Sequence, residues 1–363
     1  MNIAEVFSEA WRNITSGASR AVWFALALAI PASGLGLADI IATQSLISAA
    51  NSYKESGADV ITLVAAGAID GEKCERLSEL PGVAAAGALR AAPDTPLLAL
   101  PGSPVPTKEI TNGLPSVLGA QVHGEGGMVV SDELGKELNV GPLAVDRNQG
   151  IATAHGTAKV DGTYDYPADG RRAGFAYGLL SPVPAGGGAF DECWVRSWPP
   201  SPEMRMLIRL SLIPGAGEPN ADPPVVSQLN TRKGTEFDGA ARFEQRVTRF
   251  GAMAALAVGM VLGYFSVRSR RLELASAKHS GVTAGTQGLQ IGIEHAVVAL
   301  MAWILAMPMI IYAARSAGLP DLPVMVVLGT KPVLVAAPAF IIGAIAGAAT
   351  IREKQLFRYF SNR

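Results

Sequence analysis

The stretch AVWFALALAIPASGLGLADII, residues 21–41, decides the fold class of this 363-residue chain. It is almost entirely apolar, and a helix needs roughly 20 apolar residues to cross the hydrocarbon core of a bilayer. Three further stretches come close to this requirement, at residues 250–267, 292–312 and 332–350. The sequence therefore predicts a membrane protein with four transmembrane α-helices, the first of them at residues 21–44.

The composition favours a membrane protein with a water-soluble portion. Of all residues, 49% are hydrophobic and 17% are charged, and the apolar residues are clustered rather than spread along the chain. Discrete spans separated by a polar domain produce this distribution. The formal net charge of -1 gives no basic surplus, so we expect membrane lipid and no nucleic acid as a partner.

The lysines and arginines beside the spans predict the orientation, because positively charged loops stay in the cytoplasm. Arg12 and Arg20 precede the first span, whereas the loop 313–331 carries only Arg315 and Lys331. Further basic residues follow the second and fourth spans: Arg268, Arg270, Arg271, Lys278, Arg352, Lys354, Arg358 and Arg363. We expect a multi-pass protein of the cell (plasma) membrane with both termini in the cytoplasm.

The segments outside the spans follow from this orientation. Residues 1–20 predict a cytoplasmic amphipathic helix that lies along the membrane surface, with a frayed tail as the alternative. The first apolar stretch could also be a cleaved signal peptide, but it is longer than the about 7–15 apolar residues typical of one. The other segments are an extracytoplasmic domain at 45–249, a cytoplasmic loop at 268–291, an external loop at 313–331 and a cytoplasmic tail at 351–363.

The domain inserted between spans one and two has mixed patterning, which predicts an α+β fold. DVITLV, residues 59–64, reads as a strand, and strands at 193–198 and 206–212 are expected to return to the same module. Apolar residues recur every three or four positions at 41–55 and 237–250. These two patterns predict stalk helices that extend the first and second spans beyond the membrane.

Both cysteines of the chain, Cys74 and Cys193, lie in the expected external domain. An oxidising compartment would allow one disulfide between them. Two unpaired buried thiols are the alternative, because the distance between the cysteines is not visible in the sequence. In the fourth span, Gly343 and Gly347 form a G-x-x-x-G pair that we expect to pack on a neighbouring helix or a second subunit.

The sequence indicates neither a metal centre nor an enzyme. The chain has four histidines: His123, His155, His279 and His295. Their spacing is not that of metal ligands. The chain contains no G-x-x-x-x-G-K-[ST] phosphate loop, and GVTAGTQG at 281–288 lacks the lysine that this motif requires. We therefore expect no catalytic residue, no bound cofactor or metal, and no ATP hydrolysis by this chain alone.

Three segments resemble the permease subunits of FtsX/MacB-type ABC transporters. RSRRLELASAKHSGVTAGTQGLQIGIEHAVV, residues 268–298, is similar to the cytoplasmic segment between the second and third spans of that family. ADVITLVAAGAIDGEKCERLSELPGVAAAGALR, residues 58–90, is similar to the opening of the MacB-like external domain. GGMVVSDELGKELNVG, residues 126–141, resembles a segment of that domain's distal lobe. Together with the four spans, these matches cover most of the chain in order.

The resemblance implies partners and a candidate site. ATP and Mg²⁺ would be bound by a separate cytoplasmic ABC ATPase subunit. Two permeases, as a homodimer, would bind two such ATPases. The residues expected to couple to the ATPase are Arg270, Arg271, Glu273, Lys278, Gly281 and Glu294. A solvated, positively charged loop is the alternative reading of this segment. For Glu294 in particular, structural pairing with Arg270 or Arg271 and a role in coupling both stay open.

By the same resemblance, the predicted function is that of a permease subunit. It would couple ATP hydrolysis on its partner to movement of the external domain, and thereby export or extract an amphipathic substrate (mechanotransmission). The alternative is an FtsX-like regulator that transports nothing and activates a cell-wall hydrolase through an external protein contact. A sensor or an accessory of antibiotic resistance is a third reading, and the substrate stays open.

Overall fold

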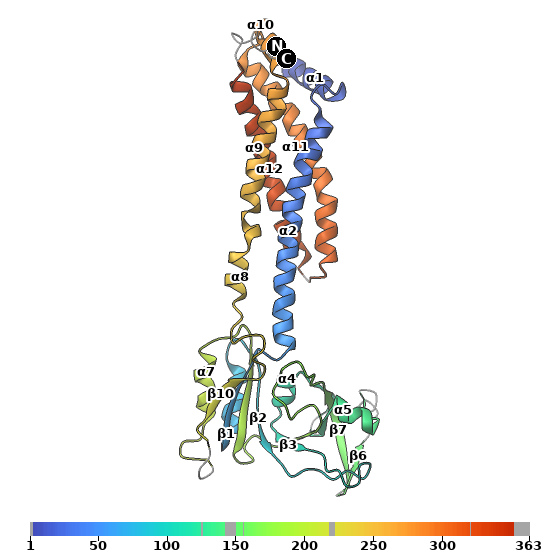
Figure 1. Ribbon diagram of the computed structural model, residues 1–363, viewed down its shortest axis with the longest axis vertical. Coiled ribbons are helices and arrows are strands. Elements are labelled where there is room, and N and C mark those ends of the chain that lie inside the picture. Colours follow the sequence, from blue (N-terminus) through green and yellow to red (C-terminus); the bar gives the residue numbers. More distant parts are fainter. Residues whose placement is uncertain are drawn as a thin grey trace. The chain divides into compact units, whose positions relative to one another are not determined.

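The computed structural model describes residues 3–124, 126–141, 150–154, 156–217, 222–319 and 321–351 (Figure 1). The chain forms two compact units: Met1–Ser48 with Ala240–Arg363, and Ala49–Gly239. Several residues used above for the orientation and the metal assessment lie outside the described residues, namely His155, Arg352, Lys354, Arg358 and Arg363. The predicted tail at 351–363 also lies outside them, apart from its first residue.

The first unit is helical. Its helices are α1 Ile3–Thr15, α2 Ala21–Glu55, α8 Gly239–Gln245, η3 Val247–Phe250, α9 Gly251–Ser269, α10 Arg271–His279, α11 Ala284–Ser316 and α12 Leu322–Ala349. Within the described residues, four helical segments are long and apolar enough to cross a membrane: α2, η3 with α9, α11, and α12. The predicted fold class, four spans with a domain between the first and the second, is confirmed.

Helices α9 and α12 pack closely through small residues. A Cβ atom placed on Gly263 of α9 would lie 1.9 Å from the backbone oxygen of Phe340, and one on Gly343 of α12 would lie 2.1 Å from that of Met260. Only glycine permits this approach of the two backbones. A Cβ on Gly347 would lie 3.1 Å from the Tyr264 oxygen of α9, so Gly343 and Gly347 both pack on a neighbouring helix of the same chain. In lipid, van der Waals contact rather than apolar attraction holds helices together.

The second unit is the α+β domain. Its strands are β1 Val60–Ile69, β2 Val83–Ala91, β3 Thr107–Ile110, β4 Gln121–Val122, β5 Met128–Ser131, β6 Gly150–Thr153, β7 Gly156–Tyr164, β8 Leu179–Pro182, β9 Phe190–Ser197 and β10 Val225–Gln228. They form one mixed sheet in the order β10-β1-β9-β2-β3-β8-β5-β7-β4, with β6 paired to β7. Pairs β3–β8 and β5–β7 are parallel, and the other pairs are antiparallel.

Short helices cover parts of this sheet: α3 Gly71–Arg76, η1 Leu77–Glu79, α4 Leu114–Leu118, α5 Asp132–Leu138, α7 Met204–Leu207 and η2 Ile208–Ser211. The strand and helix signals at residues 58–90 correspond to β1, α3 and β2. A disulfide joins Cys74 of α3 to Cys193 of β9, across 119 residues of sequence. It ties the first helix of the domain to a strand that pairs with both β1 and β2.

Two predictions about the external domain and its stalks are wrong. Residues 206–212 are not a strand but belong mainly to α7 and η2. Met204, Ile208 and Ser211 are the buried residues there, and their spacing of four and three positions is that of a helix face. A short apolar run does not distinguish strand from helix by itself.

The second stalk is not one continuous helix. Helix α8 ends at Gln245, and Arg246 has the extended backbone angles φ -61° and ψ 134° before η3 begins. At this break the Arg246 guanidinium donates to the Asp39 carboxylate of α2 at 2.7 Å, and the Thr248 hydroxyl donates to the same oxygen at 2.6 Å. The first stalk, in contrast, is helical as predicted, since α2 continues without interruption to Glu55.

Candidate functional site

The segment expected to couple to an ATPase forms a short helix, α10, that packs on the ends of the spans. Its Leu274 and Ala275 are buried in a cluster whose other members are Val267 of α9, Ile291 of α11, and Ala344, Ala348 and Ile351 at the end of α12. Helix α10 is therefore a packed element of the helical unit and not a loop surrounded by water. Because α10 contacts three spans, a displacement of α10 would exert a force on all three of them.

A buried ion pair fixes the start of α10. The guanidinium of Arg270 donates to the Glu294 carboxylate of α11 at 2.5 Å, and the side chains are 12% and 2% exposed, respectively. The same guanidinium donates twice to Glu273, at 2.6 and 3.1 Å. Glu273 is 53% exposed, so the two carboxylates that share Arg270 sit in very different surroundings. The structural pairing considered for Glu294 is present, and its partner is Arg270.

Helix α1 joins this cluster through Asn13. Its side-chain amide donates to Glu294 at 2.7 Å, and the amide of Gln290 donates to the same oxygen at 3.4 Å. Asn13 was not among the residues that the sequence singled out. The available signal was that Asn13 lies seven positions after Val6 and three after Ala10, both of which are buried, so all three share one helical face.

Two further side chains hold α10 against its neighbours. The Lys278 ammonium donates to the carbonyl oxygens of Ile351 at 2.8 Å and Ala348 at 3.5 Å, at the C-terminal end of α12, where a cation also offsets the helix dipole. The amide of Gln287 in α11 donates to the Leu274 carbonyl at 2.9 Å. Gln287 was not among the expected site residues.

The two remaining expected residues, Arg271 and Gly281, lie at the start of α10 and shortly after its end. Arg271 is the first residue of α10. Gly281 follows the helix with a φ of +96°, a backbone conformation that L side chains rarely adopt, so glycine ends α10 and turns the chain toward α11. Thr283 then caps α11 by accepting from the Thr286 amide at 3.3 Å. The structure thus brings Arg270, Glu273 and Glu294 into direct contact and places Lys278 at the end of α12.

His295, next to Glu294, is buried among the spans. Its Nε2 lies 2.5 Å from the Ser266 hydroxyl of α9 and its Nδ1 lies 2.8 Å from the Ile291 carbonyl. Its ring also stacks near Phe340 of α12, with centroids 4.9 Å apart. These contacts give His295 a role in tying three helices together. Among the described residues, no group of three or more His, Cys, Asp or Glu side chains could hold a metal ion.

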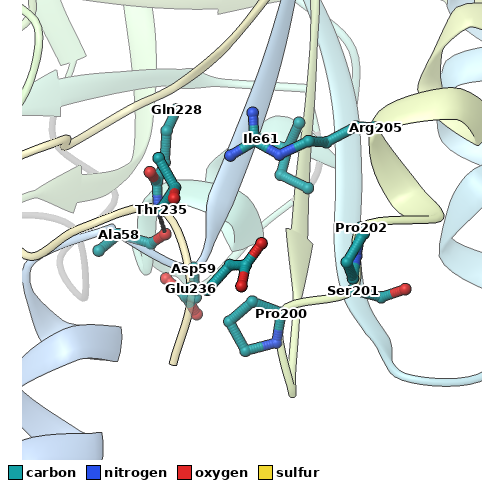
Figure 2. A pocket seen from close by; sticks show the side chains of 10 residues that line it. All are labelled: Ala58, Asp59, Ile61, Pro200, Ser201, Pro202, Arg205, Gln228, Thr235 and Glu236. Atoms are coloured by element: carbon teal, nitrogen blue, oxygen red, sulfur yellow. Dashed lines mark hydrogen bonds between the residues drawn. The ribbon is translucent and has the colours of Figure 1, made fainter. Parts of the chain in front are cut away.

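In the external domain, a pocket is lined by Asp59, which lies at the entry to β1 (Figure 2). Asp59 is 2% exposed, and neither of its carboxylate oxygens has a hydrogen-bond partner among the described residues. The Arg196 guanidinium of β9 lies 3.7 Å away, too far for a hydrogen bond. Burial therefore raises the pKa of Asp59 above its usual range, although Arg196 acts in the opposite direction.

Comparison with known proteins gives partial similarities. No protein-family model and no curated protein matches this chain. The periplasmic region of MacB from Actinobacillus actinomycetemcomitans is similar over 44% of this chain and 85% of that one, with 12% identity and a TM-score of 0.32. The extracellular domain of the noncanonic ABC-type transporter YknZ from Gram-positive bacteria is similar over 42% of this chain and 92% of that one, with 13% identity and a TM-score of 0.29.

A domain of a permease protein from Porphyromonas gingivalis is similar over 46% of this chain and 94% of that one, with 13% identity and a TM-score of 0.31. Each of the three similarities covers less than half of this chain. The chain itself has four candidate membrane spans, with an α+β domain between the first and the second.

Proposed function

We propose that this chain is the permease subunit of an ABC transporter and works by mechanotransmission. A separate cytoplasmic ATPase subunit binds and hydrolyses ATP with Mg²⁺, and this chain converts closure of the ATPase into movement of its external domain. The movement exports or extracts an amphipathic substrate. The observation that supports the proposal most is the packing of α10 on α9, α11 and α12 together with the Arg270–Glu294 ion pair.

The proposed coupling follows from where α10 is anchored. Its apolar side chains are buried against the three span ends, so a force applied to α10 acts on packed side chains rather than on a flexible loop. Arg270 and Glu294 prevent α10 from sliding along α11, since the separation of a buried ion pair is strongly unfavourable. The exposed Glu273 is then a group that the ATPase can contact.

The second step of the proposal uses the continuity of α2. This helix runs from Ala21 to Glu55 without a break, and β1 begins only five residues later at Val60. In the proposal, a tilt of the span acts on the external domain through this short connection. Two permeases, paired as a homodimer, would move two external domains in one cycle.

Reconstitution with the ATPase tests the proposal. The chain is produced together with a candidate ABC ATPase from the same genome, purified, and placed in lipid vesicles, where ATP hydrolysis is measured with and without the permease. We expect a stable complex in which the double variant Arg271→Ala, Glu273→Ala lowers the hydrolysis that the permease stimulates, while the external variant Ser103→Ala, at an exposed position, does not. Failure of every ATPase candidate to bind, or unchanged activity in the α10 variant, would overturn the proposal.

A further inference from the structure

The turn between α1 and α2 contains a hollow of about 620 Å³. Its lining residues are Ile14, Gly17, Arg20, Ala21, Val22, Trp23 and Phe24. The lining is therefore apolar apart from one arginine, and all of it belongs to the helical unit. The hollow adjoins the first turn of candidate span α2, which begins at Ala21. In a membrane, this is the depth at which lipid headgroups meet the hydrocarbon core.

Large apolar side chains are exposed around the hollow. Trp23 is 74% exposed and Val22 is 58% exposed, although both line it. On α1, Trp11 and Phe7 are exposed three and seven positions before Ile14, so they lie on the helical face that leads to the hollow. Exposed tryptophan at the end of a span is typical of the interfacial region of a bilayer. The surroundings therefore fit acyl chains and not water.

Arg20 is the one charged residue among those that line the hollow. It is exposed, and among the described residues no carboxylate forms an ion pair with it. Arg12, one turn before the end of α1, is also exposed, but it lies 4.0 Å from Glu9 and does not line the hollow. A guanidinium that has no ion-pair partner within the described part of the chain, beside an apolar hollow, attracts a ligand that combines an anionic group with an apolar body.

We propose that this hollow binds the headgroup of one anionic phospholipid, with the phosphate at Arg20 and the acyl chains along Val22 and Trp23. A zwitterionic lipid offers the same phosphate, but its cationic group would meet the guanidinium, so an anionic lipid is favoured. The bound lipid would hold α1 against the membrane surface at the entry to the first span. The inference is independent of the proposed coupling to an ATPase.

Lipid binding by the full chain tests this inference. The protein is purified in a neutral detergent and titrated with short-chain phosphatidylglycerol or phosphatidylcholine, and the bound lipid is counted by native mass spectrometry. Arg20 has a φ of +50°, so Arg20→Asn is chosen as the neutral variant because asparagine tolerates this backbone conformation. Arg20→Lys keeps the charge, and Arg12→Gln is the matched control. Melting temperatures establish that all variants are folded.

We expect saturable binding of phosphatidylglycerol that Arg20→Asn weakens about fivefold, the effect of one arginine near an anionic lipid surface. Arg20→Lys and Arg12→Gln should stay close to the original protein. Equal binding of the two lipids would overturn the inference, as would an equal loss in the Arg20→Asn and Arg12→Gln variants. Displacement of the lipid by inorganic phosphate at the same concentration would show a free-anion site instead and would also overturn it.

Discussion

The guanidinium of Arg270 lies between two carboxylates that differ in burial: it donates at 2.5 Å to Glu294, which is almost fully buried, and at 2.6 Å to Glu273, which is exposed. Removal of one partner of a buried ion pair leaves an uncompensated charge and costs about 3–5 kcal/mol, whereas an exposed pair contributes about 0.2–1 kcal/mol. One arginine thus offers a matched comparison within the candidate coupling site.

Glu294→Gln should lower the melting temperature of the purified protein clearly, and Glu273→Gln should leave it almost unchanged. The reason is that Glu294 is buried, so its loss leaves Arg270 without a buried counter-charge, whereas Glu273 is exposed and water can take its place. Thermal unfolding in detergent, followed by the loss of the monodisperse chromatography peak, measures both variants. Equal melting temperatures for the two variants would show that the buried pair does not anchor α10.

Substitution of Gly263 tests the contact between α9 and α12. In Gly263→Ala the new Cβ would lie 1.9 Å from the Phe340 oxygen, so the two helices must separate and the variant should be destabilised. Gly292→Ala in α11 is the control, because no heavy atom lies within 4 Å of the Cβ it adds. Alanine is favoured over glycine in a helix by about 1 kcal/mol in water, so this control should be neutral or slightly stabilising. A tolerated Gly263→Ala would contradict the close packing.

In the external domain, substitution of aspartate by asparagine should have opposite effects on stability at Asp59 and at Asp161. Asp161 is buried but accepts from the Gly127 amide at 2.7 Å and lies 2.6 Å from the Lys159 ammonium, whereas the oxygens of Asp59 have no hydrogen-bond partner among the described residues. At neutral pH, Asp161→Asn should destabilise the protein by about 1–3 kcal/mol. Asp59→Asn should stabilise it, because burial outweighs the attraction of Arg196 at 3.7 Å and raises the pKa of Asp59. Denaturant unfolding of the full chain measures both.

The gain from Asp59→Asn should depend on pH. Because burial raises the pKa of Asp59 in the folded protein, its protonation favours folding. This contribution is complete below the unfolded pKa, near 3.8, and is lost as the pH rises through the higher folded value. The stability difference between Asp59→Asn and the original protein should therefore shrink on acidification. A difference that stays constant with pH would mean that Asp59 is not an unfavourable buried carboxylate.

Cysteine labelling tests the orientation. The chain's own cysteines are joined in a disulfide and should not react, so single cysteines can be introduced at exposed positions. Ser103→Cys in the external domain should react with a membrane-impermeant maleimide in intact cells, and Ser276→Cys in α10 should react only after permeabilisation. The opposite pattern would place α10 outside the cytoplasm and end the proposed contact with a cytoplasmic ATPase.

The spans were predictable because hydrophobic burial in lipid requires about 20 apolar residues in one helix, and this signal is local. The order of strand, helix and strand at 58–90 could also be predicted, because its apolar patterns and turn residues are local signals too. The contact between Asn13 and Glu294 joins residues 281 positions apart, and no local pattern reports such a distance. The misread segment at 206–212 and the break at Arg246 are short, and there tertiary contacts outweigh local preference.

Site-specific crosslinking from α10 tests the proposed coupling most directly. A photoreactive amino acid replaces Ser276, which is exposed on α10, or Ser316, which is exposed at the other end of α11. After irradiation of membranes from the native host, the crosslinked polypeptide is isolated and tested for ATP binding. We expect an ATP-binding partner from Ser276 and none from Ser316. The absence of an ATP-binding product at Ser276, or the same product from both positions, would contradict coupling through α10.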